Sequence, residues 1–172
     1  MFPRLSLRPR LALLLQRSKR TDRAFNQSRT LYVDAHCHLA HRDYKNGRDD
    51  EVAQKAAAAN VSRICVNGLE TVSNEAVLSL CERHTNLVPA CGIHPLHAPC
   101  EVYSAEEWDL DMPIPARFDV SEELIKIANW AATGKIAAIG ECGLDAFYYK
   151  TDLYLKRQEE VLEKLCEVSV TH

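Results

Sequence analysis

Beyond residue 30, short apolar stretches alternate along the chain with longer amphipathic ones. The short apolar stretches predict strands. They span residues 31–36, 61–68, 86–93 and 135–141. The longer stretches are alanine-rich or carry apolar residues at helical spacing, which predicts helices. They span residues 49–60, 73–84, 119–132 and 152–168.

This alternation predicts the fold class. Four consecutive strand–helix units imply a parallel sheet whose strands are joined by helical crossovers, because parallel neighbours cannot be linked by a tight turn. An α/β fold is therefore expected before any chemistry is considered.

The composition is that of a globular protein. Of the 172 residues, 47% are hydrophobic and 26% are charged. No apolar run approaches the roughly 20 residues that a membrane-spanning helix needs, so no membrane partner is expected.

The net charge of −3 conceals two different parts of the chain. Residues 1–30 contain eight Lys and Arg against one acid, Asp22, so this part is +7; residues 31–172 contain 13 basic and 23 acidic residues, so that part is −10. The apolar run LALLL is shorter than a secretory core, which argues against secretion. The segment suits a mitochondrial targeting peptide, a disordered basic tail or a nucleic-acid-binding arm, and we expect a mitochondrial, cytoplasmic or nuclear location.

Seven cysteines are scattered through the sequence without a Cys-x-x-Cys pair. Their odd number and irregular spacing favour free thiols over a disulfide framework. Several of them stand in apolar stretches, where cysteine behaves as a small buried residue.

Residues with chemically reactive side chains follow three of the predicted strands. In a β/α barrel the active site forms at the C-terminal ends of the strands, where residues distant in sequence meet. Taken singly, each of these residues has an ordinary structural explanation, and it is their shared placement that indicates a site. They are His36 and His38, His94 and His97, and Glu141 and Asp145.

The first of these groups has the spacing of a metal site. On an extended backbone, alternate side chains point the same way, so Asp34, His36 and His38 share a face. Two imidazoles suit zinc and other transition metals, and added carboxylates extend the range to manganese or magnesium. Glu141 follows the apolar run IAAIG, in which Gly140 is expected to remove side-chain bulk beside the carboxylate.

Three segments, VDAHCHLA, CGIHPLH and above all AAIGECGLD, resemble the signature segments of the TatD family of metal-dependent deoxyribonucleases, within the amidohydrolase-like superfamily of TIM barrels. The resemblance covers roughly residues 31–165. It implies a (β/α)₈ TIM-barrel fold, a site for one or two divalent ions (Mg, Mn or Zn), and hydrolysis of DNA phosphodiester bonds by metal-activated water.

The resemblance also implies roles for individual residues. His36 and His38 match the metal-binding His-x-His pair, and Glu141 matches the metal-bridging carboxylate, which is also the expected catalytic group. His94 matches the histidine of the Gly-x-His-Pro segment and is expected to bind substrate rather than metal.

The chain departs from the family pattern in length. A complete barrel needs about 250 residues and eight β-α units, whereas residues 31–172 contain four predicted units. They are expected to form the N-terminal half of a TatD-like barrel, without the two histidines and the aspartate that the family carries on later strands. Self-association or a partner is then expected to complete the half-barrel. The alternatives are a related hydrolase of esters or amides and a catalytically incomplete fragment.

Overall fold

The computed structural model describes residues 30–44, 46–104, 108, 113–148 and 151–172. The chain divides into two units, Met1–Leu31 and Tyr32–His172, and the second carries all of the helices and strands described below. The prediction of a basic tail or targeting peptide falls on residues 1–30, of which only residue 30 lies within the described part, so it stays a prediction.

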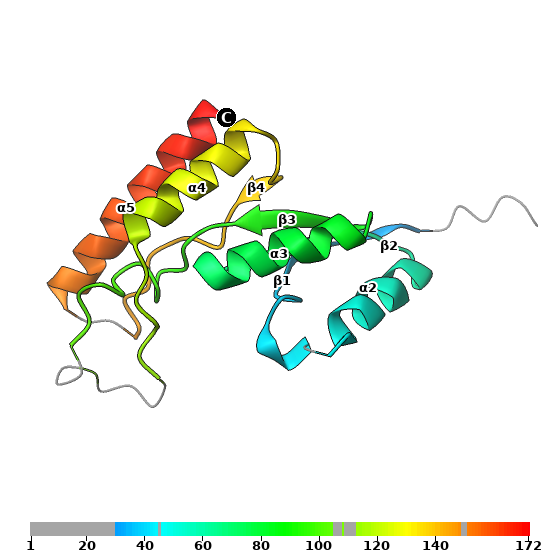
Figure 1. The fold of residues 1–172 in the computed structure, drawn as a ribbon, viewed down its shortest axis with the longest axis horizontal. Coiled ribbons are helices and arrows are strands. Elements are labelled where there is room, and N and C mark those ends of the chain that lie inside the picture. Colours follow the sequence, from blue (N-terminus) through cyan, green and yellow to red (C-terminus); the bar gives the residue numbers. More distant parts are fainter. Residues whose placement is uncertain (1–29, 45, 105–107, 109–112, 149–150) are drawn as a thin grey trace, which may run out of the picture. The chain divides into compact units, whose positions relative to one another are not determined.

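The second unit contains one four-stranded parallel sheet (Figure 1). The strands lie side by side in chain order, and each pairs in parallel with the next, as the alternating pattern predicts. They are β1 (Tyr32–Cys37), β2 (Val61–Asn67), β3 (Leu87–Cys91) and β4 (Ala138–Ile139).

Each strand is followed by a helix, so all four predicted β-α units are confirmed. The helices are α2 (Arg48–Ala58), α3 (Thr71–Arg83), α4 (Val120–Ala132) and α5 (Asp152–Thr171), with a 3₁₀ turn, η1 (Arg42–Tyr44), before α2. Helices α2 and α3 pack on β2 and β3, whereas α4 and α5 lie side by side and both contact β4 (Figure 1).

Local sequence explains where the helices begin and end. Asn60 follows α2 with φ of 67°, a left-handed conformation that asparagine tolerates better than most residues. Asp119 caps α4 by accepting a hydrogen bond of 2.8 Å from the Glu122 backbone. Helix α3 begins at Thr71, before the predicted start at Ser73, because the Glu70 carboxylate accepts hydrogen bonds from the first-turn backbone.

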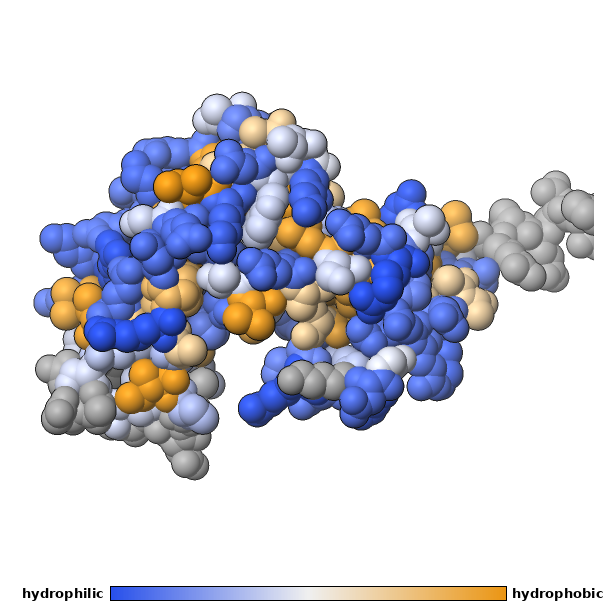
Figure 2. All heavy atoms as spheres, viewed as in Figure 1, coloured by the Kyte–Doolittle hydropathy of each residue, from blue (hydrophilic) through white to orange (hydrophobic). Residues whose placement is uncertain are grey.

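The core lies between the sheet and the helices. Among its fully buried members are residues of β2, α3, α4 and α5: Val66, Val77, Leu80, Ile127 and Leu165. At the edge of the sheet, β1 is less covered: Tyr32 is 58% exposed and Val33 is 66% exposed. In the view of Figure 2, polar side chains cover most of the surface over α4 and α5, and apolar side chains show between them.

Strand β4 is much shorter than its predicted span of 135–141. Hydrogen bonds to β3 nevertheless continue on both sides of it, from Ala137 N to Pro89 O and from Gly140 N to Cys91 O. The backbone around Glu141 is thereby held against β3. Among the described residues, none of the helices combines the length and apolarity needed to cross a membrane.

Candidate metal centre

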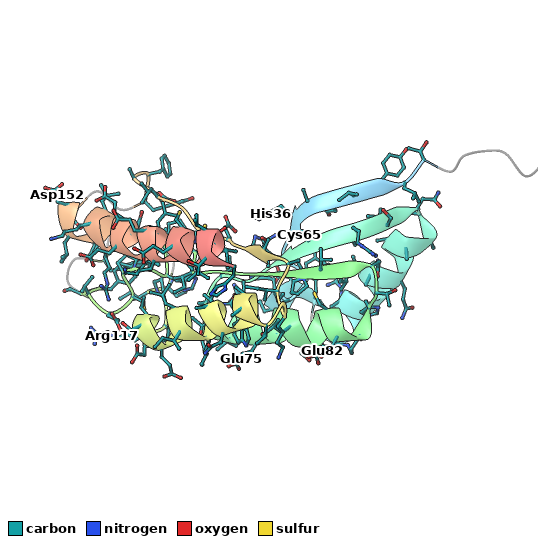
Figure 3. The ribbon with its side chains drawn as sticks, turned by 90° about the horizontal axis from the view of Figure 1, so that it is seen from above. His36, Cys65, Glu75, Glu82, Arg117 and Asp152 are labelled. Atoms are coloured by element: carbon teal, nitrogen blue, oxygen red, sulfur yellow. The ribbon has the colours of Figure 1, made fainter. Side chains whose placement is uncertain are left out.

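Three side chains from opposite edges of the sheet converge at the C-terminal ends of its strands. His36 lies near the end of β1 (Figure 3), His38 follows that strand, and Glu141 follows β4. The Nε2 atoms of the two histidines are 3.1 Å apart, and Glu141 Oε2 lies 3.4 Å from His36 Nε2 and 3.2 Å from His38 Nε2. The structure thus brings together the three residues that sequence reasoning assigned to metal binding.

The size of this triangle fits a divalent transition-metal ion. Bonds of about 2.0–2.2 Å from nitrogen or oxygen to such an ion place neighbouring ligand atoms roughly 3 to 3.5 Å apart, which matches the three observed separations. Two imidazoles and one carboxylate are also a donor set that zinc and manganese accept. The residues therefore fit a metal ion, without selecting which one.

A backbone contact prepares His38 for this role. His38 Nδ1 lies 3.0 Å from the Asn67 carbonyl oxygen, and because a carbonyl can only accept, Nδ1 must carry the hydrogen. In the neutral ring, Nε2 then presents its lone pair to His36 and Glu141. A fixed outer hydrogen bond of this kind orients metal-ligating histidines in general.

His94 is arranged in the opposite way. Its Nδ1 accepts a hydrogen bond of 3.1 Å from the Leu96 backbone, so in the neutral ring Nε2 carries the hydrogen. That Nε2 lies 3.6 Å from Glu141 Oε1. Burial lowers the pKa of His94, opposed by the nearby Glu141 carboxylate. A neutral His94 with Nε2–H directed toward the site is a hydrogen-bond donor rather than a metal ligand.

The backbone of Glu141 is held from two sides. Its N–H donates to the Gly68 carbonyl at 3.1 Å, and the Gly140–Glu141 peptide lies directly against Gly92, where a Cβ would stand 2.6 Å from Glu141 O. A Cβ at Gly140 would meet only Asn67 Oδ1, at 3.6 Å. A Cβ would thus fit at Gly140, and the crowded position is Gly92, because its Cα faces the neighbouring segment.

The other reactive residues at the strand ends have local partners. Asp34 Oδ1 accepts from the His36 backbone at 3.1 Å, and Asp145 Oδ1 accepts from the backbone of Phe147 and Tyr148. Asp34 thus bonds within β1, whereas Asp145 bonds to the turn that follows it, and both stand outside the three-residue cluster. His97 is largely buried, and this burial lowers its pKa, opposed by Glu70.

Sequence reasoning missed Asn67 and Gly68, whose carbonyls hold His38 and Glu141. Both act through backbone oxygens, which any residue type carries, so side-chain chemistry did not reveal them. The only signal in the sequence was their position at the end of the second predicted strand, the same level at which the other strands carry their reactive residues.

All seven cysteines are free, as predicted. Burial raises the pKa of Cys37 to about 11 and the pKa of Cys81 and Cys91 to about 12. These thiols are protonated at neutral pH, which favours a packing role over metal binding. Cys37, although it lies between the two histidines, is not in the cluster.

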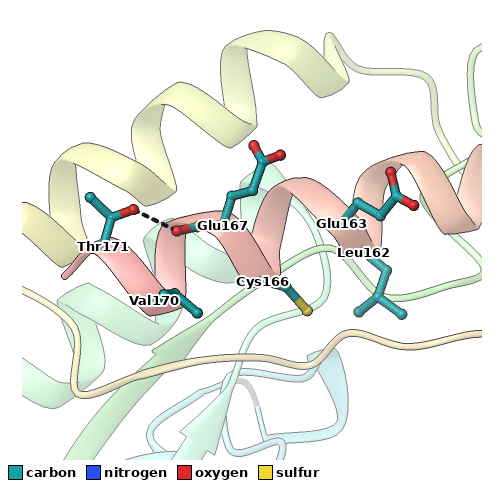
Figure 4. A pocket seen from close by; sticks show the side chains of 6 residues that line it. All are labelled: Leu162, Glu163, Cys166, Glu167, Val170 and Thr171. Atoms are coloured by element: carbon teal, nitrogen blue, oxygen red, sulfur yellow. Dashed lines mark hydrogen bonds between the residues drawn. The ribbon is translucent and has the colours of Figure 1, made fainter.

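A depression of 610 Å³ lies elsewhere, along one face of α5 (Figure 4). It is lined by Leu162, Glu163, Cys166, Glu167, Val170 and Thr171 and includes none of the cluster residues. The Thr171 hydroxyl donates to the Glu167 carbonyl within the helix (Figure 4).

Comparison with known proteins shows similarity across most of this unit. The family model described as TatD related DNase matches residues 33–172. The human protein named deoxyribonuclease TATDN3 is 33% identical over 116 residues, covering 66% of this chain and 38% of its own length. The Escherichia coli protein YjjV, named an uncharacterized metal-dependent hydrolase, is 31% identical over 133 residues, covering 77% of this chain and 44% of its own.

Solved structures give the same picture of the fold. The crystal structure of E. coli YjjV, described as a TatD homolog, superposes with a TM-score of 0.53 and covers 80% of this chain and 46% of its own. A TatD family hydrolase from Entamoeba histolytica has a TM-score of 0.59 at 18% identity, covering 83% and 47%. The chain therefore spans under half the length of each of these relatives, and its four parallel strands with their helices form a half-barrel of the TIM type.

Proposed function

Because the chain belongs to the TatD family of metal-dependent hydrolases, we propose that its metal centre serves the hydrolysis of DNA phosphodiester bonds. The observation that carries the proposal is the triangle of His36 Nε2, His38 Nε2 and Glu141 Oε2, with separations of 3.1 to 3.4 Å. These atoms belong to residues in or just after the two edge strands of the sheet, and they meet at the end where β/α barrels carry their active sites.

The proposed roles follow from the atoms that each residue presents. His36, His38 and Glu141 would hold the ion, magnesium, manganese or zinc. When bound, a divalent ion lowers the pKa of water and stabilises the charge that develops on phosphate oxygens. The His94 Nε2–H, close to the second carboxylate oxygen of Glu141, is placed to donate a hydrogen bond to a phosphate oxygen of the substrate.

Charge supports a role for the ion in binding as well as in chemistry. Residues 31–172 carry a formal charge of −10, which by itself repels a polyanion. A bound divalent ion supplies local positive charge that the residue count omits. The site can then attract a phosphate although the surrounding unit is acidic.

Cleavage assays on single-stranded and duplex DNA test the proposal. The chain is expected to cleave DNA in the presence of Mn²⁺ or Mg²⁺, and a chelator is expected to stop the cleavage. Glu141→Gln and His38→Asn should lower the rate about a hundredfold or more, since even outer partners of metal ligands cost 10- to 100-fold. The matched controls Glu159→Gln and His172→Asn, which change exposed residues of α5 and its C-terminal cap, should cleave normally.

Two outcomes would overturn the proposal. Cleavage that survives both the chelator and Glu141→Gln would place the activity outside this site. Failure to cleave any DNA, together with metal-dependent turnover of an ester or amide substrate, would establish the alternative hydrolase instead.

A further inference from the structure

A buried polar pair on α3 and α4 underlies the segments that hold Glu141. Asn74 of α3 is fully buried, and Glu123 of α4 is 1% exposed. Asn74 Nδ2 donates to Glu123 Oε1 at 2.8 Å. Burying a carboxylate and an amide costs free energy unless they are hydrogen-bonded, and an apolar pair would fill the same space at lower cost. Packing alone therefore does not explain why a polar pair is buried here.

The amide of Asn74 holds the backbone of Gly92 at both of its polar groups. Nδ2 donates to the Gly92 carbonyl at 2.9 Å, and Oδ1 accepts from the Gly92 N–H at 3.3 Å. Both amide hydrogens are therefore used, one by Gly92 and one by Glu123. A rotated amide would set Oδ1 against two acceptors, so Glu123 fixes the orientation of the Asn74 amide.

Asn74 also lies against Gly68. A Cβ at position 68 would stand 2.0 Å from Asn74 Oδ1 and 3.0 Å from its Cα. Gly68 and Gly92 are the two positions that hold Glu141: the Gly68 carbonyl accepts from the Glu141 N–H, and Gly92 packs against the Gly140–Glu141 peptide. One side chain thus contacts both supports of the carboxylate-bearing segment.

We infer that Asn74 and Glu123 are positioning residues for Glu141: Asn74 holds Gly68 and Gly92 in place, and Glu123 holds Asn74. This inference rests on the proposed function, because it assigns the pair to the metal centre described above. Neither residue belongs to the three-residue cluster, so the pair acts through the backbone. Lys126 Nζ, 3.8 Å from Glu123 Oε2, partly offsets the buried charge.

Two measurements on the full chain test the inference. The first is hydrogen exchange of the Glu141 amide in metal-free protein, which reports directly on its bond to Gly68. The second is Mn²⁺ affinity by calorimetry. Asn74→Ala and Glu123→Ala should speed the exchange of this amide at least tenfold relative to core amides of β2, and weaken Mn²⁺ binding about tenfold. Glu123→Gln keeps an acceptor for Asn74, so its Glu141 exchange rate and its Mn²⁺ affinity should both stay within about threefold of the wild-type values.

The control is Ile127→Ala, which truncates a fully buried side chain of α4 that is not among the nearest neighbours of a Cβ at either glycine. It should lower the melting temperature as much as Asn74→Ala while leaving Glu141 exchange and Mn²⁺ affinity unchanged. If Asn74→Ala does not fold, the comparison of Glu123→Ala with Glu123→Gln tests the inference in its place.

The results separate the inference from the proposed function. The inference would be overturned if the Glu141 amide exchanged at the wild-type rate in Asn74→Ala and Glu123→Ala. It would also be overturned if Ile127→Ala changed this exchange rate and the Mn²⁺ affinity as much as they do. If the wild-type chain binds no Mn²⁺, the proposed function fails, and the exchange measurement still decides whether the pair positions Glu141.

Discussion

At the scale of single residues, the centre distinguishes its histidines by the atom that each ring offers. His38 is held through Nδ1 by a carbonyl and presents a lone pair, whereas His94 is held through Nδ1 by an N–H and presents a hydrogen. Residues of the same type thus receive opposite roles from backbone groups that differ only in being acceptor or donor.

The contact between Gly92 and the Glu141 backbone gives a prediction at this scale. Gly92→Ala places a methyl group 2.6 Å from Glu141 O, and overpacking against backbone costs about 1 to 3 kcal/mol. We expect the free energy of unfolding to fall by that amount and Mn²⁺ affinity to fall with it. Gly140→Ala, whose Cβ would stand 3.6 Å from Asn67 Oδ1, should change stability by about 0.5 kcal/mol or less.

Urea unfolding and Mn²⁺ titration of the two variants provide the measurement. Equal losses in Gly92→Ala and Gly140→Ala would contradict the crowding at position 92.

At the scale of elements, a group of charges joins the start of α2 to the end of α3. Asp50 Oδ1 lies 2.6 Å from His84 Nε2 and 3.1 Å from Arg83 Nε. Hydrogen bonds from His84 and then Arg83 lower the pKa of Asp50 below its ordinary value of 3.8. These contacts link α2 to the end of α3.

The direction of this shift predicts how stability responds to acid. A carboxyl whose pKa is depressed in the folded state contributes stability above its unfolded pKa and loses it as the pH falls through the folded value. Wild type should therefore lose more stability below about pH 4 than Asp50→Asn, which has no such carboxyl. The effect should be modest, because the Asp50 and His84 side chains are only partly buried and Arg83 is exposed.

Urea midpoints measured between pH 7 and pH 3 check this, with Asp43→Asn as the control for removing an exposed acid. Parallel curves for wild type and Asp50→Asn would show that the contact contributes nothing to folding.

At the scale of the whole molecule, the three-residue cluster brings together the two edges of the sheet. His36 and His38 belong to the β1 edge and Glu141 to the β4 edge, so an ion bound by all three closes the sheet's active end across its width. Any ligand that binds only the folded state stabilises it. An ion bound by the three-residue cluster should therefore stabilise the fold.

Mn²⁺ at 100 times its dissociation constant should add about 2.7 kcal/mol to the free energy of unfolding, which for a chain of this size raises the melting temperature by about 5 to 10 °C. A chelator should reverse this rise in melting temperature. Glu141→Gln should show no rise with Mn²⁺, whereas Glu159→Gln should show the same rise as wild type. Differential scanning calorimetry measures this directly. An equal shift in Glu141→Gln would place the ion elsewhere.

Much of the fold was predictable from the sequence because the pattern is local. Alternating apolar and amphipathic stretches specify all four strands and helices, and parallel pairing follows from their order. The candidate ligands were also predictable, since His36, His38 and Glu141 stand beside strand ends that must meet at one edge of the sheet.

Only the tertiary structure decided how those residues work together. His38 is held by the Asn67 carbonyl and Glu141 by the Gly68 carbonyl. Every residue type has a backbone carbonyl, so the sequence does not reveal these contacts. The crowding at Gly92 and the Asn74–Glu123 pair depend on segments that approach only when α3 and α4 pack on the sheet. The sequence by itself determined which donors are present and near which strand ends, and packing determined their orientation, because orientation is set by neighbours distant along the chain.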